Sequence, residues 1–304
     1  MHIPERQQGI ALAVLAGVIF GTSGIFTRAI SGISPLGIAA SRLILAFFFM
    51  LLLLCRQHAF KELKRSVRHY RLLMLLGIIS SFHFLCFVLA IQKTFIANAL
   101  ILVNTAPILV LVLAPIFLKE TITRLDLLSV AITFLGACLI VGFDRIILTP
   151  DHWFGDLCAL GSAFCYALYV LVARQLRQTY SSAVIMCWFF GLGGIFLVLG
   201  GLWRVDPFFF APTRASFIFL GLLGVLPTGI GHFSYNLSLK YIPAAKASTI
   251  ILLEPVTGTL FAALFLQEIP PVSSIIGICI ALSGIGIAAF SHLTSTAETQ
   301  RSRP

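Results

Sequence analysis

Ten apolar segments of membrane-spanning length constrain this chain more than any motif does. A hydrocarbon core of ~30 Å needs ~20 apolar residues in a helix that rises ~1.5 Å per residue. Segments of that length lie near residues 9–30, 35–55, 71–91, 96–118, 125–143, 154–174, 181–203, 215–239, 244–266 and 272–292. No polar stretch between them is long enough for a soluble domain. The sequence therefore predicts an all-α integral membrane protein with ten transmembrane helices, followed by a disordered cytoplasmic tail at 293–304.

The basic residues indicate how these spans are oriented. Of 21 Lys and Arg residues, fifteen lie at the termini or in loops that follow even-numbered spans, whereas five lie in the other loops. Cytoplasmic loops are enriched in Lys and Arg, so both termini are predicted to be cytoplasmic in a bacterial-type inner membrane. The net charge of +10 then reflects residues that meet membrane lipid, and nucleic acid is not an expected partner.

The two halves of the chain resemble each other. An offset of 148 positions matches eight residues of the first half with identical residues of the second: Leu89, Ala97, Ala99, Pro107, Phe117, Leu118, Glu120 and Gly136. Each half, 1–146 and 147–292, holds five spans, and an odd number places the second copy in the opposite orientation. The sequence therefore predicts two inverted five-helix repeats, an arrangement used for alternating access.

Several short motifs make the chain similar to the ten-helix EamA-type branch of the drug/metabolite transporter superfamily. They are Ser41-Arg42-Leu43, Ala97-x-Ala99 leading to Pro107 and Lys119-Glu120, Ala245-x-Ala247 leading to Leu253-Glu254-Pro255 and Gln267-Glu268, and the glycines Gly136 and Gly284. Members of that family export or import amino acids, metabolites, sugars or drugs. The resemblance implies a ten-helix transporter of a small-molecule substrate.

Enzymes and ATP-driven pumps lack support in the sequence. The chain has no HExxH, GxSxG or GxxxxGK[ST] motif and no metal-type Cys/His cluster, so no metal site or cofactor is predicted. The missing phosphate loop excludes ATP hydrolysis by this chain and leaves gradients or facilitated diffusion as energy sources. Inverted duplication favours a carrier over a channel, receptor or structural membrane protein.

Two prolines interrupt the repeat-related spans four and nine at matching depths. Pro107 and Pro255 each remove the amide that would bond the carbonyl four residues back, on Val103 and Ile251. Interrupted spans at corresponding positions point to a transporter's central site, although a simple packing kink is the alternative.

Two charged residues lie within spans. Glu254 is the acidic residue near the middle of span nine, and such a charge marks a functional site by default. A neutral acid bonded to backbone released by Pro255 is the alternative, which we favour because the glutamate–proline pair is a general feature of the family resembled. Arg42, about two turns inside span two, is expected to reach the outer headgroups or to pair locally.

Polar residues on one face of span eight predict a solute cavity. His232, Tyr235 and Asn236 have the spacing i, i+3, i+4 and share a helix face, although hydrogen bonding between helices is the alternative. Further substrate-binding candidates on spans three, four and six are His83, Phe87, Asn98, Asn104, Tyr166 and Tyr169.

Aromatic candidates suit an apolar or aromatic amino acid or a related metabolite, and we predict a secondary transporter that exports it. A proton-coupled drug or sugar transporter and a non-transport membrane protein are the alternatives. Monomer and homodimer both remain open.

The charge count makes topology testable. Cysteines placed in segments 57–69 and 294–304 of a cysteine-free variant should react with a membrane-impermeant thiol reagent only from the cytoplasm. Labelling of intact cells and of inverted vesicles measures this, with a cysteine near Arg145 as the control that reacts from outside. Reaction of both test segments from outside would reverse the predicted orientation.

Overall fold

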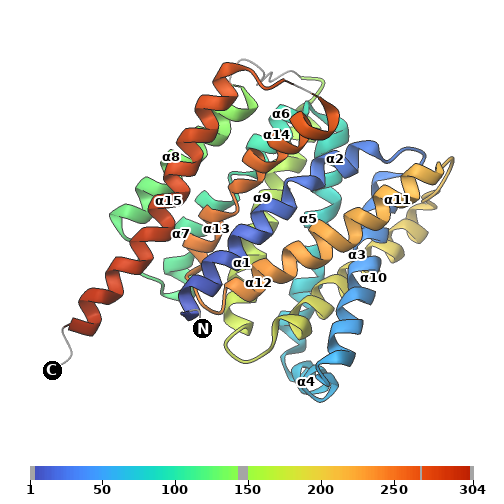
Figure 1. Cartoon of the computed structure of the whole chain (residues 1–304). Helices are drawn as coiled ribbons and strands as arrows, with labels where there is room; N and C mark the ends of the chain where they lie inside the picture. The colour runs from blue at the N-terminus through green and yellow to red at the C-terminus, as the bar shows by residue number, and fades with distance from the viewer. Residues whose placement is uncertain (1–3, 143–149, 268, 302–304) are drawn as a thin grey trace.

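The protein is a bundle of ten membrane-spanning helical segments. The computed structural model describes residues 4–142, 150–267 and 269–301, and ten helical segments in these ranges are long and apolar enough to cross a membrane (Figure 1). They coincide with the ten segments predicted from hydrophobic run length, which confirms the all-α membrane fold. The predicted boundary between the two halves, at 146/147, lies outside the described residues.

Four spans are each built from more than one helix. The first five spans are α1 (Glu5–Phe20) with α2 (Thr22–Ala29), α3 (Pro35–Arg56), α5 (Tyr70–Lys93), α6 (Ile96–Val103) with α7 (Ala106–Leu118), and α8 (Arg124–Val141). The next five are α9 (Trp153–Leu176), α10 (Ser182–Arg204), α11 (Arg214–Leu223) with η3 (Gly224–Gly231) and α12 (His232–Ser238), α13 (Ala244–Ile250) with α14 (Leu253–Leu266), and α15 (Val272–Arg301). A short helix, α4 (Phe60–Ser66), and a 3₁₀ turn, η1 (Val67–His69), precede α5.

The spans form a central group that is flanked on one side by α8 and α15 and on the other side by α10 and α3. At one side α8 packs extensively along α15, and these two helices run side by side in Figure 1. At the other side α10 packs against α3 and α5. Between them α1 contacts α12, α14 and η3, while α9 contacts α5, α6 and α7. The interrupted spans therefore all belong to the central group.

Glycines allow the α8–α15 pair to approach closely. A Cβ atom added to Gly136 of α8 would lie 2.4 Å from the backbone nitrogen of Ala281, and one added to Gly284 of α15 would lie 2.7 Å from that of Thr133. Only residues without a side chain fit such contacts, and small residues commonly mediate helix packing in membranes. The repeat-matched glycines are thus packing residues.

Span eight contains a break that its sequence did not predict. Residues Gly224–Gly231 form a π-helix around Pro227, and the hydroxyl of Thr228 donates to the carbonyl of Leu223, five residues back, at 2.6 Å. Wide turns of this kind often occur at functional sites. Proline explains the change, because it cannot donate the α-helical hydrogen bond and its ring clashes with the preceding turn.

Ionic contacts join several spans at the N-terminal side of the bundle. Glu120, just after α7, pairs with Arg174 of α9 at 3.0 Å and accepts the backbone amide of Ala244, the first residue of α13, at 3.0 Å. Arg174 also donates to the carbonyl of Leu239 after α12. These contacts connect spans four, six, eight and nine at one face. The repeat-matched Glu268 lies outside the described residues.

A second ion pair lies beside this network. Lys246 of α13 is buried, and its Nζ lies 3.6 Å from Oδ1 of Asp126 in α8. Asp126 also forms a capping box with Thr123, which satisfies backbone amides at the start of α8.

The C-terminal segment differs from its prediction. Helix α15 continues to Arg301, whereas composition predicted a disordered tail from residue 293. No proline lies between Pro271 and Pro304, so nothing in the backbone forces the helix to end where the apolar segment ends.

Candidate solute-binding cavity

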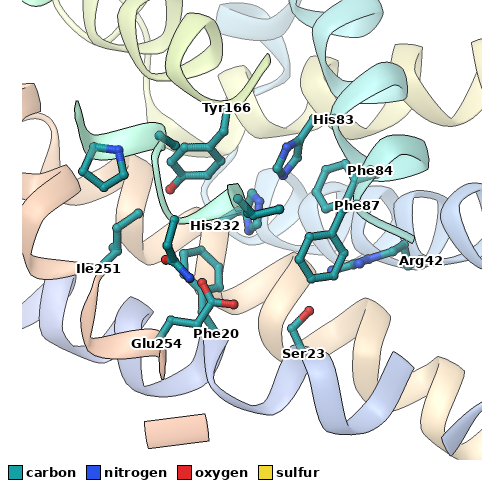
Figure 2. Close-up of a pocket in the computed structure, with 14 residues that line it drawn as sticks. Phe20, Ser23, Arg42, His83, Phe84, Phe87, Tyr166, His232, Ile251 and Glu254 are labelled. Atoms are coloured by element: carbon teal, nitrogen blue, oxygen red, sulfur yellow. The ribbon is translucent and has the colours of Figure 1, made fainter. Parts of the chain in front are cut away.

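A cavity lies among the membrane-spanning segments (Figure 2). It is lined by Phe20, Ser23, Arg42, His83, Phe84, Phe87, Val103, Asn104, Ala106, Pro107, Tyr166, His232, Ile251 and Glu254. These residues come from spans one, two, three, four, six, eight and nine. The spans of the outer pair α8–α15 do not contribute.

The four interrupted spans all break at this cavity. Cavity residues stand beside each break: Phe20 and Ser23 around Gly21 in span one, Val103 and Asn104 with Ala106 and Pro107 in span four, His232 directly after η3 in span eight, and Ile251 and Glu254 in span nine. Non-helical backbone at membrane depth is tolerated where it lines a cavity or is buried in protein. The helix breaks therefore all lie beside the cavity, where non-helical backbone can be accommodated.

Two histidines line the cavity, and the Nδ1 of each lies within hydrogen-bonding distance of a backbone carbonyl. The Nδ1 of His83 lies 3.0 Å from the carbonyl oxygen of Ser162, and that of His232 lies 3.2 Å from the carbonyl oxygen of Pro227. In a neutral imidazole that donates through Nδ1, the Nε2 is an acceptor. The Nε2 of His232 is buried and has no hydrogen-bond partner among the described residues. The two ring centres are 6.2 Å apart.

Four aromatic rings, those of Phe20, Phe84, Phe87 and Tyr166, also contribute to the wall. The Tyr166 ring lies 5.3 Å from His83, and the Phe20 ring meets His232 edge-on at 4.7 Å. Phe84 lies 5.1 Å from His232. Ring separations in this range are favourable contacts, and this part of the wall is largely apolar.

Arg42 reaches the cavity from α3 and is nearly fully buried, with 2% of its surface exposed. Its Nε donates to the hydroxyl of Thr228 in η3 at 2.9 Å. The guanidinium carbon lies 4.7 Å from the ring centre of Phe84 and 5.7 Å from that of Phe87, which are cation–π distances. Arg42 was expected to reach the headgroups or to pair locally, and the structure shows the local pairing, because α5 and η3 enclose its side chain.

Glu254 approaches the cavity from the side opposite Arg42 (Figure 2). It lies in the first turn of α14, where the helix dipole favours a negative charge. Among the described residues, its carboxyl group has no hydrogen-bond or ion-pair partner. The favoured interpretation, an acid bonded to backbone released by Pro255, is therefore not what the structure shows. The carbonyl of Ile251 instead accepts the amide of Glu254 at 2.9 Å.

Some predicted site residues line the cavity, and others lie behind its wall. His83, Phe87, Asn104, Tyr166, His232, Pro107 and Glu254 are lining residues. Tyr169, Tyr235, Asn236 and Pro255 are not, and the two tyrosines support Tyr166 from behind at ring distances of 5.6 and 5.7 Å. Tyr169 stacks on Phe189 at 4.4 Å, and the Tyr235 hydroxyl bonds Ser248 at 2.8 Å.

Asn98 has a structural partner away from the cavity. Its amide donates to Oδ1 of Asp156 at 3.2 Å, and the hydroxyl of Thr94 donates to the same oxygen at 2.6 Å. These bonds fasten the start of span four to the start of span six, so Asn98 is corrected from a candidate ligand to a helix-end contact.

The sequence interpretation missed Arg42, Phe20 and Ser23 as cavity residues. The signals were an arginine inside an apolar span, a glycine at the span-one break, and the Gly- and Pro-rich run at 224–231.

Comparison with known proteins assigns the family. The EamA-like transporter family matches the chain twice, at residues 7–142 and 153–290. The chain belongs to the EamA-like transporter family. This confirms the resemblance inferred from short motifs.

Relatives of this EamA-like protein share most of its length. An uncharacterized transporter of Archaeoglobus fulgidus is 27% identical over 286 residues, which cover 92% of this chain and 96% of the relative. A probable terminal-alkyne amino-acid exporter of Streptantibioticus cattleyicolor is 26% identical over 191 residues, 62% of each protein. One crystal structure superposes with a TM-score of 0.79 at 15% identity, covering 92% of this chain and 96% of that chain, and shows the same fold. The protein is thus a multi-pass membrane transporter.

Proposed function

We propose that this transporter is a secondary carrier that moves an amino acid or a related metabolite across the inner membrane, with the cavity as its binding site. The observation that supports this proposal most is that four interrupted spans meet at a cavity lined by aromatic rings and by two residues of opposite formal charge, Arg42 and Glu254. Binding at the junction of discontinuous helices is a recurring carrier design. The family excludes neither sugars nor drugs, so the choice rests on the cavity's chemistry.

Glu254 supports recognition of an ammonium group. A carboxylate in a pocket without a protein partner is costly, at ~2.5–3.5 kcal/mol for an acid at mid-membrane, and a cationic ligand offsets that cost. The walls formed by Phe20, Phe84 and Phe87 suit an apolar or aromatic side chain. An amino acid combines both features.

Three findings support alternating access and export. The family matches each half separately, as duplicated halves require, and inverted repeats would let one bundle open to either side. The contacts around Glu120 tie four spans at the N-terminal face, which is predicted to be cytoplasmic. The relative from Streptantibioticus cattleyicolor, named as a probable amino-acid exporter, supports export.

A proton-coupled drug or sugar carrier is the second candidate. The same unpartnered carboxyl of Glu254 favours it, since a carboxyl held in an apolar environment can bind and release a proton. Substrate discrimination at Glu254 separates the two candidates.

Transport itself is the first test. Proteoliposomes that contain the protein should exchange labelled phenylalanine faster than protein-free liposomes. Ser23→Trp, which fills the cavity, should reduce exchange to that background, whereas Leu52→Trp on the exposed side of α3 should leave it intact. Exchange of a sugar or a drug, and of no amino acid in a panel, would refute the amino-acid assignment.

The second test concerns Glu254. Glu254→Gln should weaken binding of phenylalanine by ~tenfold or more, because a charge-assisted hydrogen bond contributes roughly 1.5–3 kcal/mol. Binding of phenylpyruvate, which lacks the ammonium group, should not weaken. Glu5→Gln at the exposed start of α1 is the matched control. Unchanged phenylalanine affinity together with loss of pH-gradient dependence would instead make Glu254 the proton site.

A further inference from the structure

Arg42 has more hydrogen-bonding capacity than the protein around it uses. It is 2% exposed and lies inside a membrane span, where a cation without partners is costly. Among the described residues, its only hydrogen bond runs from Nε to Thr228, and no carboxylate forms an ion pair with it. The buried Nη1 has no partner there. A guanidinium normally uses several of its five N–H donors when buried.

Neighbouring groups fix the orientation of the guanidinium but form no hydrogen bond with its Nη1. Thr228 donates its own proton to the carbonyl of Leu223 at 2.6 Å, so its oxygen is held as an acceptor for Nε. Phe84 and Phe87 contact the guanidinium at 4.7 and 5.7 Å. Figure 2 shows the head group beside these rings at the edge of the cavity, with Ser23 nearby. The donors are therefore set in place before a ligand binds, which lowers the entropic cost of binding.

We propose that Arg42 binds the carboxylate of the transported solute and selects carboxylate-bearing compounds over their neutral analogues. This assignment deepens the proposed function and rests on it. A guanidinium presents parallel N–H donors that match the two oxygens of a carboxylate. The cavity then discriminates strongly, because a ligand without the carboxylate leaves Nη1 buried and unpaired.

The charge balance of the cavity favours a carboxylate over a phosphate ester. Arg42 and Glu254 line the same space from spans two and nine, and carry opposite formal charges. A zwitterion adds no net charge and meets each group with its opposite. A dianionic phosphate would add negative charge near Glu254, where like charges repel. Arg42 and Glu254 together thus define an α-amino acid as the ligand.

The test compares three ligands that differ only at the charged groups. Phenylalanine, phenylalaninamide and phenylpyruvate are measured by calorimetric binding to the purified full-length protein. In Arg42→Gln, affinity for phenylalanine and for phenylpyruvate should fall by ~tenfold or more, while affinity for phenylalaninamide stays within about twofold. Arg28→Gln, which alters an exposed arginine outside the cavity, is the matched control and should change none of the three.

Each other outcome has a defined meaning. Equal losses for the acid and the amide would show a structural role and overturn the proposal, as would no loss at all. If Arg42→Gln does not fold, Arg42→Lys is the deciding variant. It should still prefer phenylalanine to phenylalaninamide but bind phenylalanine more weakly, because lysine keeps the positive charge but lacks the paired N–H donors of a guanidinium. Wild-type affinity of Arg42→Lys for the acid would refute the assignment.

The ligand set also separates this proposal from the proposed function. If the wild-type protein bound phenylpyruvate and neither amino compound, the amino-acid assignment would fail, while the loss of phenylpyruvate binding in Arg42→Gln would still establish Arg42 as the carboxylate site. If none of the three bound, both proposals would fall.

Discussion

Backbone hydrogen bonding in lipid is the constraint from which the rest of this structure follows. An unsatisfied amide or carbonyl costs several kcal/mol in hydrocarbon, so a spanning helix breaks only where protein or a cavity compensates. Four spans break here, and all four breaks meet at one cavity. Released groups find local partners, as when the carbonyl of Ile251 accepts the amide of Glu254 at 2.9 Å. The breaks therefore place polar groups at mid-bundle without exposing backbone to lipid.

The same breaks explain how two charges are held inside an apolar bundle. The π-helix of span eight presents the Thr228 hydroxyl to Arg42 at 2.9 Å, and two phenylalanine rings contact the guanidinium. The helix break in span nine places Glu254 in the first turn of α14, where the helix dipole stabilises its negative charge. Neither charge is neutralised by an ion pair among the described residues, in contrast to Glu120 and Asp126, which have cationic partners near the end of the bundle. The proposed amino-acid ligand would meet each of these two charges with its opposite.

Hydrophobic run length was sufficient to predict the ten spans, because a bilayer fixes the number of apolar residues that a helix needs. Of the three span-eight residues that helical spacing grouped, His232 lines the cavity, whereas Tyr235 and Asn236 do not. The paired prolines located two of the four breaks. The surroundings of Arg42 and Asn98 could not be predicted from the sequence, because they depend on residues that are distant along the chain. Arg42 is buried because η3 and α5 close over it, and Asn98 bonds Asp156, which lies 58 positions away. The π-helix forms around Pro227. It was not predicted, because the apolar residues around Pro227 would also fit an ordinary α-helical span.

The central claim is that the cavity where the breaks meet is the transport path, and the accessibility of Ser23 tests it most directly. Ser23 lines the cavity and is buried, with 5% of its surface exposed. In a cysteine-free variant, Ser23→Cys should react with a small membrane-impermeant thiol reagent from either side of the membrane, and a transported solute should slow the reaction. Ser23→Cys that transports solute yet reacts from neither side, with or without solute, would contradict the account.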